Sequence, residues 1–185
     1  MKRTGPLVPP PGAPPRLSSA PFPPYSYVPR VTPHPVTDPA GHSFGVRDEP
    51  VELGGRRLPE DWREVDEYLF GIDLFNAAYF WEAHESWEAV WHAVARSSVT
   101  GRYLQGLIQT SASLLQRHCG REIGARNLRE RSSRNLEPVQ GWLEERGRSR
   151  YMGVELAAWE AAADAHLRSA ARPFPFLVPT DRTAS

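Results

Sequence analysis

The sequence predicts an all-α protein, an antiparallel bundle of about five helices with an N-terminal proline-rich extended arm. Thirteen of the nineteen prolines lie within residues 1–40. Because each proline removes a backbone donor and restricts the residue before it, this part should form neither helices nor central strands. Residues 60–167 contain a single proline, and their apolar side chains recur at helical spacing. Short loops between these helical segments favour antiparallel neighbours.

The composition limits the class of protein. A chain of 185 residues has room for one domain, or for one domain plus an arm. The formal net charge is zero, so we expect no nucleic-acid partner and no membrane. The single cysteine, Cys119, excludes an internal disulfide and fits a cytoplasmic location. We expect no signal peptide, and no run approaches the roughly 18 apolar residues of a membrane span.

The proline-rich part divides into two segments. Residues 1–20 are predicted to be a disordered proline-rich tail, although PLVPPPGAPP within it would also suit a docking peptide. Residues 21–58 are predicted to be an extended arm packed on the body, since they carry aromatic and branched side chains that a solvated linker does not need. The alternative for this segment is a disordered tail with exposed apolar side chains.

Residues 59–172 are the predicted helical bundle, and residues 173–185 are an extended tail. Pro59, followed by Glu60 and Asp61, is typical of a helix start, because negative charge suits the positive end of the helix dipole. Pro138 is expected to end the fourth helix. The five predicted helices cover residues 60–75, 79–95, 101–118, 122–137 and 153–170.

The segment YFWEAHESWEAVWHAVA, residues 79–95, carries the chemistry. On a helix, His84 and Glu88 are neighbours at i,i+4, and so are Glu88 and His92. The spacing suits a pair of metal ligands, but it equally suits a hydrogen bond in which Glu88 fixes the tautomer of His84. The segment is not a zinc-protease helix, because that motif requires a second histidine where Glu88 stands.

One helix supplies few ligands, so a metal would need donors from elsewhere. The candidates are Asp73, His118, and His34 and His42 of the arm. On the next helix, Gln105 and Gln109 belong to a row of amides, and Gln109 could reach the polar edge of the preceding helix. Solvated glutamines are the alternative.

Three sequence elements resemble the domain-of-unknown-function family number 309. They are the turn Leu74–Asn76, the helix from Phe80 to Trp91 with its Glu-Ala-His-Glu core, and the segment Gln105–Gln109. The resemblance implies a small all-helical bacterial protein, often labelled a predicted metal-dependent hydrolase. It implies a site made of His84, Glu85, Glu88, Trp91 and Gln109. Ala78 replaces a glycine of the family pattern, so a left-handed turn there would be strained.

Two functions remain open from the sequence. The first is a metal-binding or acid–base site with His84, Glu88, His34 and His42 as ligands and a divalent metal as cofactor. If it is a hydrolase, Glu85 or Glu88 would act as the base, with Trp91, Gln105, Gln109, Asp73 and His92 around the pocket. The second is a non-catalytic interaction or oligomerisation module, with another copy or another protein as partner, in which the same residues form a structural polar network.

Overall fold

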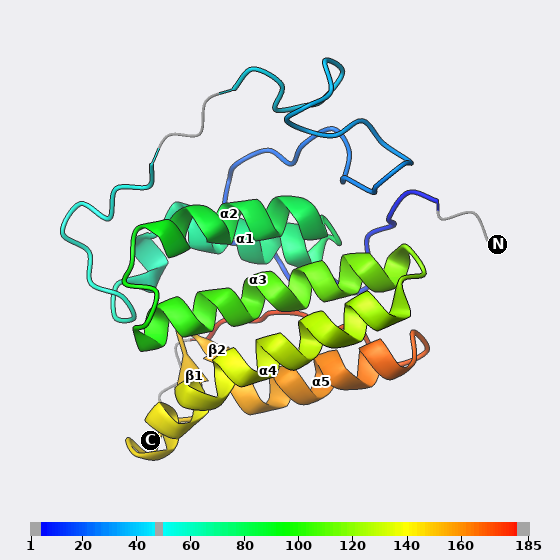
Figure 1. Ribbon diagram of the computed structural model, residues 1–185. Coiled ribbons are helices and arrows are strands. Elements are labelled where there is room, and N and C mark those ends of the chain that lie inside the picture. Colours follow the sequence, from blue (N-terminus) through cyan, green and yellow to red (C-terminus); the bar gives the residue numbers. More distant parts are fainter. Residues whose placement is uncertain (1–4, 47–49, 181–185) are drawn as a thin grey trace.

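The computed structural model describes residues 5–46 and 50–180, and it confirms the all-α prediction (Figure 1). A short 3₁₀ turn, η1, comes first, and two strands form an antiparallel hairpin between the last two helices. The elements are η1 (Trp62–Glu64), α1 (Asp66–Asn76), α2 (Phe80–His92), α3 (Val99–His118), α4 (Glu122–Glu144), β1 (Arg150–Tyr151), β2 (Val154–Glu155) and α5 (Leu156–Arg168).

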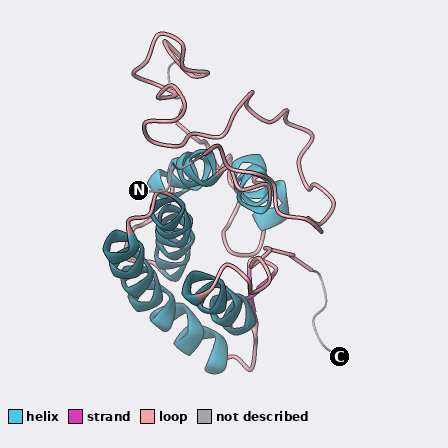
Figure 2. Ribbon diagram, turned by 90° about the vertical axis from the view of Figure 1, so that its right-hand side faces the viewer, coloured by secondary structure: helices cyan, strands magenta, loops and turns pink. Residues whose placement is uncertain are grey.

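Helices that follow one another in the chain pack side by side, α1 on α2, α2 on α3 and α3 on α4. Figure 2 shows this arrangement nearly along the helix axes, with the arm outside α1 and α2. One core joins all five helices, and burying each large apolar side chain stabilises the fold by about 1.5–3 kcal/mol. The largest fully buried side chains are Trp87, Tyr68, Tyr103, Tyr151, Phe75, Ile72, Leu74, Leu104, Leu107, Leu136, Leu156 and Leu177.

Two helix boundaries differ from the prediction. The first helix does not run from residue 60, because Val65 adopts an extended conformation (φ −106°, ψ 94°) that separates η1 from α1. The fourth helix does not end at Pro138 but continues to Glu144. A proline inside a helix costs about 3 kcal/mol, and here the burial of Leu136, Val139 and Leu143 offsets that cost.

The turn between α1 and α2 sets the direction in which α2 leaves. Ala78 has φ 64°, so this alanine adopts a left-handed conformation that favours glycine. Such a conformation costs a non-glycine residue about 1–2 kcal/mol. Backbone bonds from Ala78 N–H to Phe75 and from Tyr79 N–H to Leu74 hold the turn, at 3.0 and 2.8 Å.

The proline-rich N-terminal part, tail and arm together and called the arm from here on, lies on the bundle through buried acids. The backbone N–H groups of Leu17 and Ser18 donate to the Asp73 carboxylate of α1, at 2.8–3.1 Å. The backbone N–H of Tyr27 donates to Glu82 of α2 at 2.7 Å. Both carboxylates belong to side chains that are nearly fully buried. Among the described helices, none combines the length and apolarity needed to cross a membrane.

Candidate functional site

The site lies on the edge of α2. Phe80, Ala83, Trp87 and Val90 bury one face of the helix in the core. The helical period then leaves His84, Glu85 and Glu88 at the margin, where all three are half-buried. The core contacts therefore fix the rotation of the helix and, with it, the position of the polar edge.

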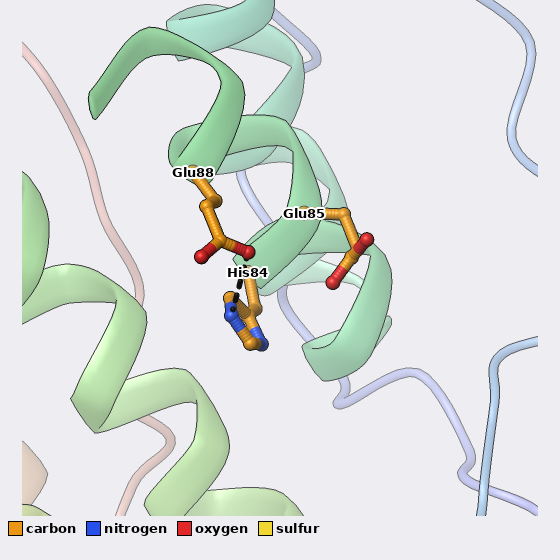
Figure 3. A group of neighbouring side chains, drawn as sticks. All are labelled: His84, Glu85 and Glu88. Carbon is orange, nitrogen blue, oxygen red and sulfur yellow. Dashed lines mark ion pairs between the residues drawn. The ribbon is translucent and has the colours of Figure 1, made fainter. Parts of the chain in front are cut away.

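These three side chains converge (Figure 3). His84 Nε2 lies 3.3 Å from Glu88 Oε2, and Glu88 Oε1 lies 4.0 Å from Nε2 of His92. One ligand atom from each of His84, Glu85 and Glu88 lies within 4.8 Å of the other two. The cluster could hold a metal ion, since it offers one imidazole and two carboxylates from successive turns of a single helix.

Burial shifts the pKa of His84. It lowers the pKa of His84, and the neighbouring Glu88 carboxylate acts in the opposite direction by favouring the imidazolium. Because burial has the larger effect, His84 is a neutral imidazole near pH 7, which is the form that binds metals. The His84–Glu88 contact is then a hydrogen bond rather than a full ion pair.

The donor set fits a first-row divalent ion. An imidazole suits zinc, iron, nickel or copper, and carboxylates suit manganese and magnesium as well. Ligand atoms on one ion lie about 3–4 Å apart, because each bond is about 2.0–2.2 Å long. A cluster whose atoms lie within 4.8 Å therefore needs small side-chain rotations to close on an ion. Two or three protein donors from this cluster would leave coordination positions for water or substrate.

The two arm histidines predicted as ligands lie elsewhere. His42 Nε2 lies 3.3 Å from Glu82 Oε1, and its Nδ1 lies 2.9 Å from the Ser43 hydroxyl. His34 packs its ring against Trp81, with centroids 5.6 Å apart, and its Nδ1 accepts from the backbone N–H of Val36. The structure does not bring either histidine into the His84/Glu85/Glu88 group.

The predicted pocket residues are also dispersed. Asp73 binds backbone N–H groups of the arm, and Gln109 accepts a hydrogen bond from Asn135 of α4 at 3.0 Å, not from α2. His92 is exposed beside Glu88, and Gln105 is half-buried on α3. Trp91 is half-buried, with its indole N–H out of contact with solvent and without a hydrogen-bond partner among the described residues.

Sequence reasoning missed Glu82, the most deeply buried acid of α2. Its carboxylate accepts from Tyr27 N–H and faces His42, and its buried Oε2 atom has no hydrogen-bond partner in the part of the chain that the structure describes. Burial raises the pKa of Glu82. A helical wheel places this residue away from the apolar arc, so no local signal could have found it. Its burial comes from the arm.

The family model of DUF309, a domain of unknown function, matches residues 68–128. This match confirms the resemblance, and it spans α1, α2, α3 and the start of α4. The matched region therefore contains the whole His84/Glu85/Glu88 cluster but neither the arm nor α5. No curated protein matches the chain.

Proposed function

We propose that the His84/Glu85/Glu88 cluster binds a divalent transition-metal ion and that the protein is a metal-dependent hydrolase. The observation that supports the proposal is the convergence of three ligand atoms within 4.8 Å on a half-buried helix edge. The lowered pKa of His84 supports it further, because burial favours the unprotonated imidazole that a metal requires.

The three residues would have different roles. His84 and Glu88 would hold the ion, and Glu85 would be placed to accept a proton from a water molecule. When bound, such an ion lowers the pKa of its water to near 7 and polarises a carbonyl or phosphoryl oxygen. If Glu85 is itself a ligand, Glu88 is the remaining base, since the two carboxylates lie on adjacent turns of α2.

The alternative is a non-catalytic interaction or oligomerisation module in which the same residues form a polar network that fixes helix register. The contacts favour the first proposal. Within the described ranges, the contacts of Glu88 with His84 and His92 stay inside α2, and Gln109 binds Asn135 of α4 rather than this cluster. A network that fixes register would have to join two helices.

The test is metal analysis of untagged protein, followed by titration with Zn²⁺ and Mn²⁺. Wild-type protein should take up about one equivalent, and His84→Ala should weaken binding by about 10- to 100-fold or more. His118→Ala is the matched control. It removes the last residue of α3, a histidine that contacts the Gly5 carbonyl and does not belong to the α2 cluster. Hydrolysis of nitrophenyl ester and phosphodiester substrates is then measured with the loaded protein.

Equal and weak metal uptake by wild type and His84→Ala would contradict the metal site. Uptake without hydrolysis would leave a metal-binding protein and remove the hydrolase. If His84→Ala lowers only the melting temperature, and metal uptake by wild type is absent, the structural module is the better description.

A further inference from the structure

We propose that a second cavity, at the end of the bundle, binds a small organic phosphate that carries a flat ring, which is the chemistry of a mononucleotide. The cavity is lined by residues at the end of α4 and in the β1–β2 hairpin. Figure 1 shows that these elements meet at one end of the bundle. Its volume is about 380 Å³, within the range of about 300–1,000 Å³ typical of small-molecule sites. None of the α2 cluster residues lines it.

Positive charge predominates in the walls of this cavity. Arg63, Arg148 and Arg150 line it together with one carboxylate, that of Glu60. Arg150 also pairs with Glu155 at 3.2 Å. Guanidinium groups bind phosphate through paired N–H donors, and a phosphate monoester offers three acceptor oxygens to more than one arginine. The charge therefore favours an anion, and the number of arginines favours a phosphate.

Guanidinium groups held on tryptophan rings give the cavity flat walls. Trp62 is itself buried, and the Arg63 guanidinium covers its ring at 4.2 Å from the centroid, so the plane on this wall is that of the guanidinium. The Arg148 guanidinium lies 6.0 Å from the centroid of the Trp142 ring. Aromatic rings and guanidinium planes are the surfaces on which nucleic-acid bases stack. An inorganic ion would not use these planes, whereas a ligand that joins a phosphate to a flat ring uses both kinds of wall.

The walls are held in place by the fold. The Tyr151 hydroxyl lies 2.8 Å from the Thr100 hydroxyl, which ties the hairpin to α3. Gly153 has φ +80°, and a Cβ there would lie 2.6 Å from the Trp62 ring, so the turn packs directly on one wall. Thr180 N–H donates to the Gly153 carbonyl at 3.0 Å. The cavity is thus formed by three separated parts of the chain before any ligand arrives.

Calorimetric titration of the full chain tests the proposal with adenosine 5′-monophosphate as the probe. Adenosine, ribose 5-phosphate and inorganic phosphate supply the ring alone, the phosphate ester alone and the ion alone. The nucleotide should bind at least about tenfold more tightly than each of the three. Arg148→Gln should weaken nucleotide binding by about tenfold or more, and it should fold normally because Arg148 is exposed.

Arg146→Gln is the matched control. Arg146 also stacks on Trp142, at 4.3 Å, but does not line the cavity, so its loss should change the affinity less than about twofold. His84→Ala should leave nucleotide binding unchanged, which separates this site from the proposed metal site. No binding up to about 5 mM nucleotide, or equal affinity for wild type and Arg148→Gln, would overturn the proposal. Ribose 5-phosphate binding as tightly as the nucleotide would overturn the requirement for a ring.

Discussion

The imidazole of His42 lies 3.3 Å from the carboxylate of Glu82, so a histidine of the arm closes over a buried acid in the first turn of α2. Both side chains are nearly inaccessible, at 7% and 4% exposure. With the Asp73 carboxylate and its bonds to Leu17 and Ser18, this contact fastens the arm to the bundle at two buried acids. The arm therefore covers the side of α2 that carries Glu82, while the His84/Glu88 edge remains half-exposed.

Glu82→Gln should change how stability depends on pH. Burial raises the pKa of Glu82 above its usual value of 4.5. The folded protein therefore favours the protonated carboxyl. The stability that depends on this protonated form is fully present below the unfolded pKa, and it is lost as the pH rises through the folded pKa. The variant lacks this titration, so its free energy of unfolding should increase relative to wild type as the pH rises above about 4.5. Denaturant unfolding at several pH values measures the difference.

Glu64→Gln is the control for that series, because Glu64 is 69% exposed and pairs with Arg56 on the surface. His42 faces Glu82 directly, so repeating the titration in a His42→Gln background separates the two groups. A difference between Glu82→Gln and wild type that stays flat or declines with pH would refute the prediction.

Gly71→Ala should destabilise the protein strongly. A Cβ at this position would lie 2.3 Å from Nε1 of Trp87, whose side chain is fully buried and whose indole N–H donates to the Tyr68 carbonyl. Because the Trp87 ring is fully buried, relieving this overlap requires repacking of the core, so the cost should reach about 1–3 kcal/mol or more. Thermal unfolding reports it.

Gly141→Ala should have the opposite effect on stability, although it is also a replacement of glycine by alanine. No atom lies within 4 Å of a Cβ at this position on α4. Alanine should therefore stabilise the helix by up to about 1 kcal/mol. If both alanine variants lower the melting temperature equally, close packing of Gly71 on Trp87 is not the cause.

The His84–Glu88 contact predicts a titration in a defined direction. Burial lowers the pKa of His84, so its NMR midpoint should lie below its usual value of 6.5. The stability that depends on neutral His84 is present above the unfolded pKa and is lost as the pH falls. Because Glu88 favours the imidazolium, Glu88→Gln should move the midpoint lower still. A midpoint that rises in Glu88→Gln would show that the carboxylate does not act on His84.

Arg129 should be a strong determinant of stability. It is buried on α4 and binds Glu160 at 3.0 Å and Asp164 at 2.7 Å, both on α5. Removing one partner of a buried ion pair costs about 3–5 kcal/mol, because the other charge remains buried. Arg129→Met should therefore destabilise the protein far more than Arg131→Met, which alters an exposed arginine and should stay within about 0.5 kcal/mol. Denaturant midpoints of both variants decide it.

Local patterns accounted for much of the fold and for one contact of the site. Helical periodicity located all five helices, and the i,i+4 spacing correctly made His84 and Glu88 neighbours, because both depend on residues within a turn or two of each other. The same reasoning was wrong at Pro138, where buried side chains on both sides of the proline carry α4 onward. It also missed the hairpin, because two-residue strands are too short to show alternation.

The sequence by itself determined the helices, the apolar face of α2 and the polar edge that carries His84, Glu85 and Glu88, since backbone geometry places these residues whatever surrounds them. Only the tertiary structure decided where the arm goes. In the folded protein His42 contacts Glu82, and the backbone N–H groups of Leu17 and Ser18 bind Asp73. Residues 59–63 and the hairpin line the same cavity. These contacts join positions that are distant in the chain, and they form because buried charged and polar groups must find partners. The periodicity of the local sequence therefore cannot predict them.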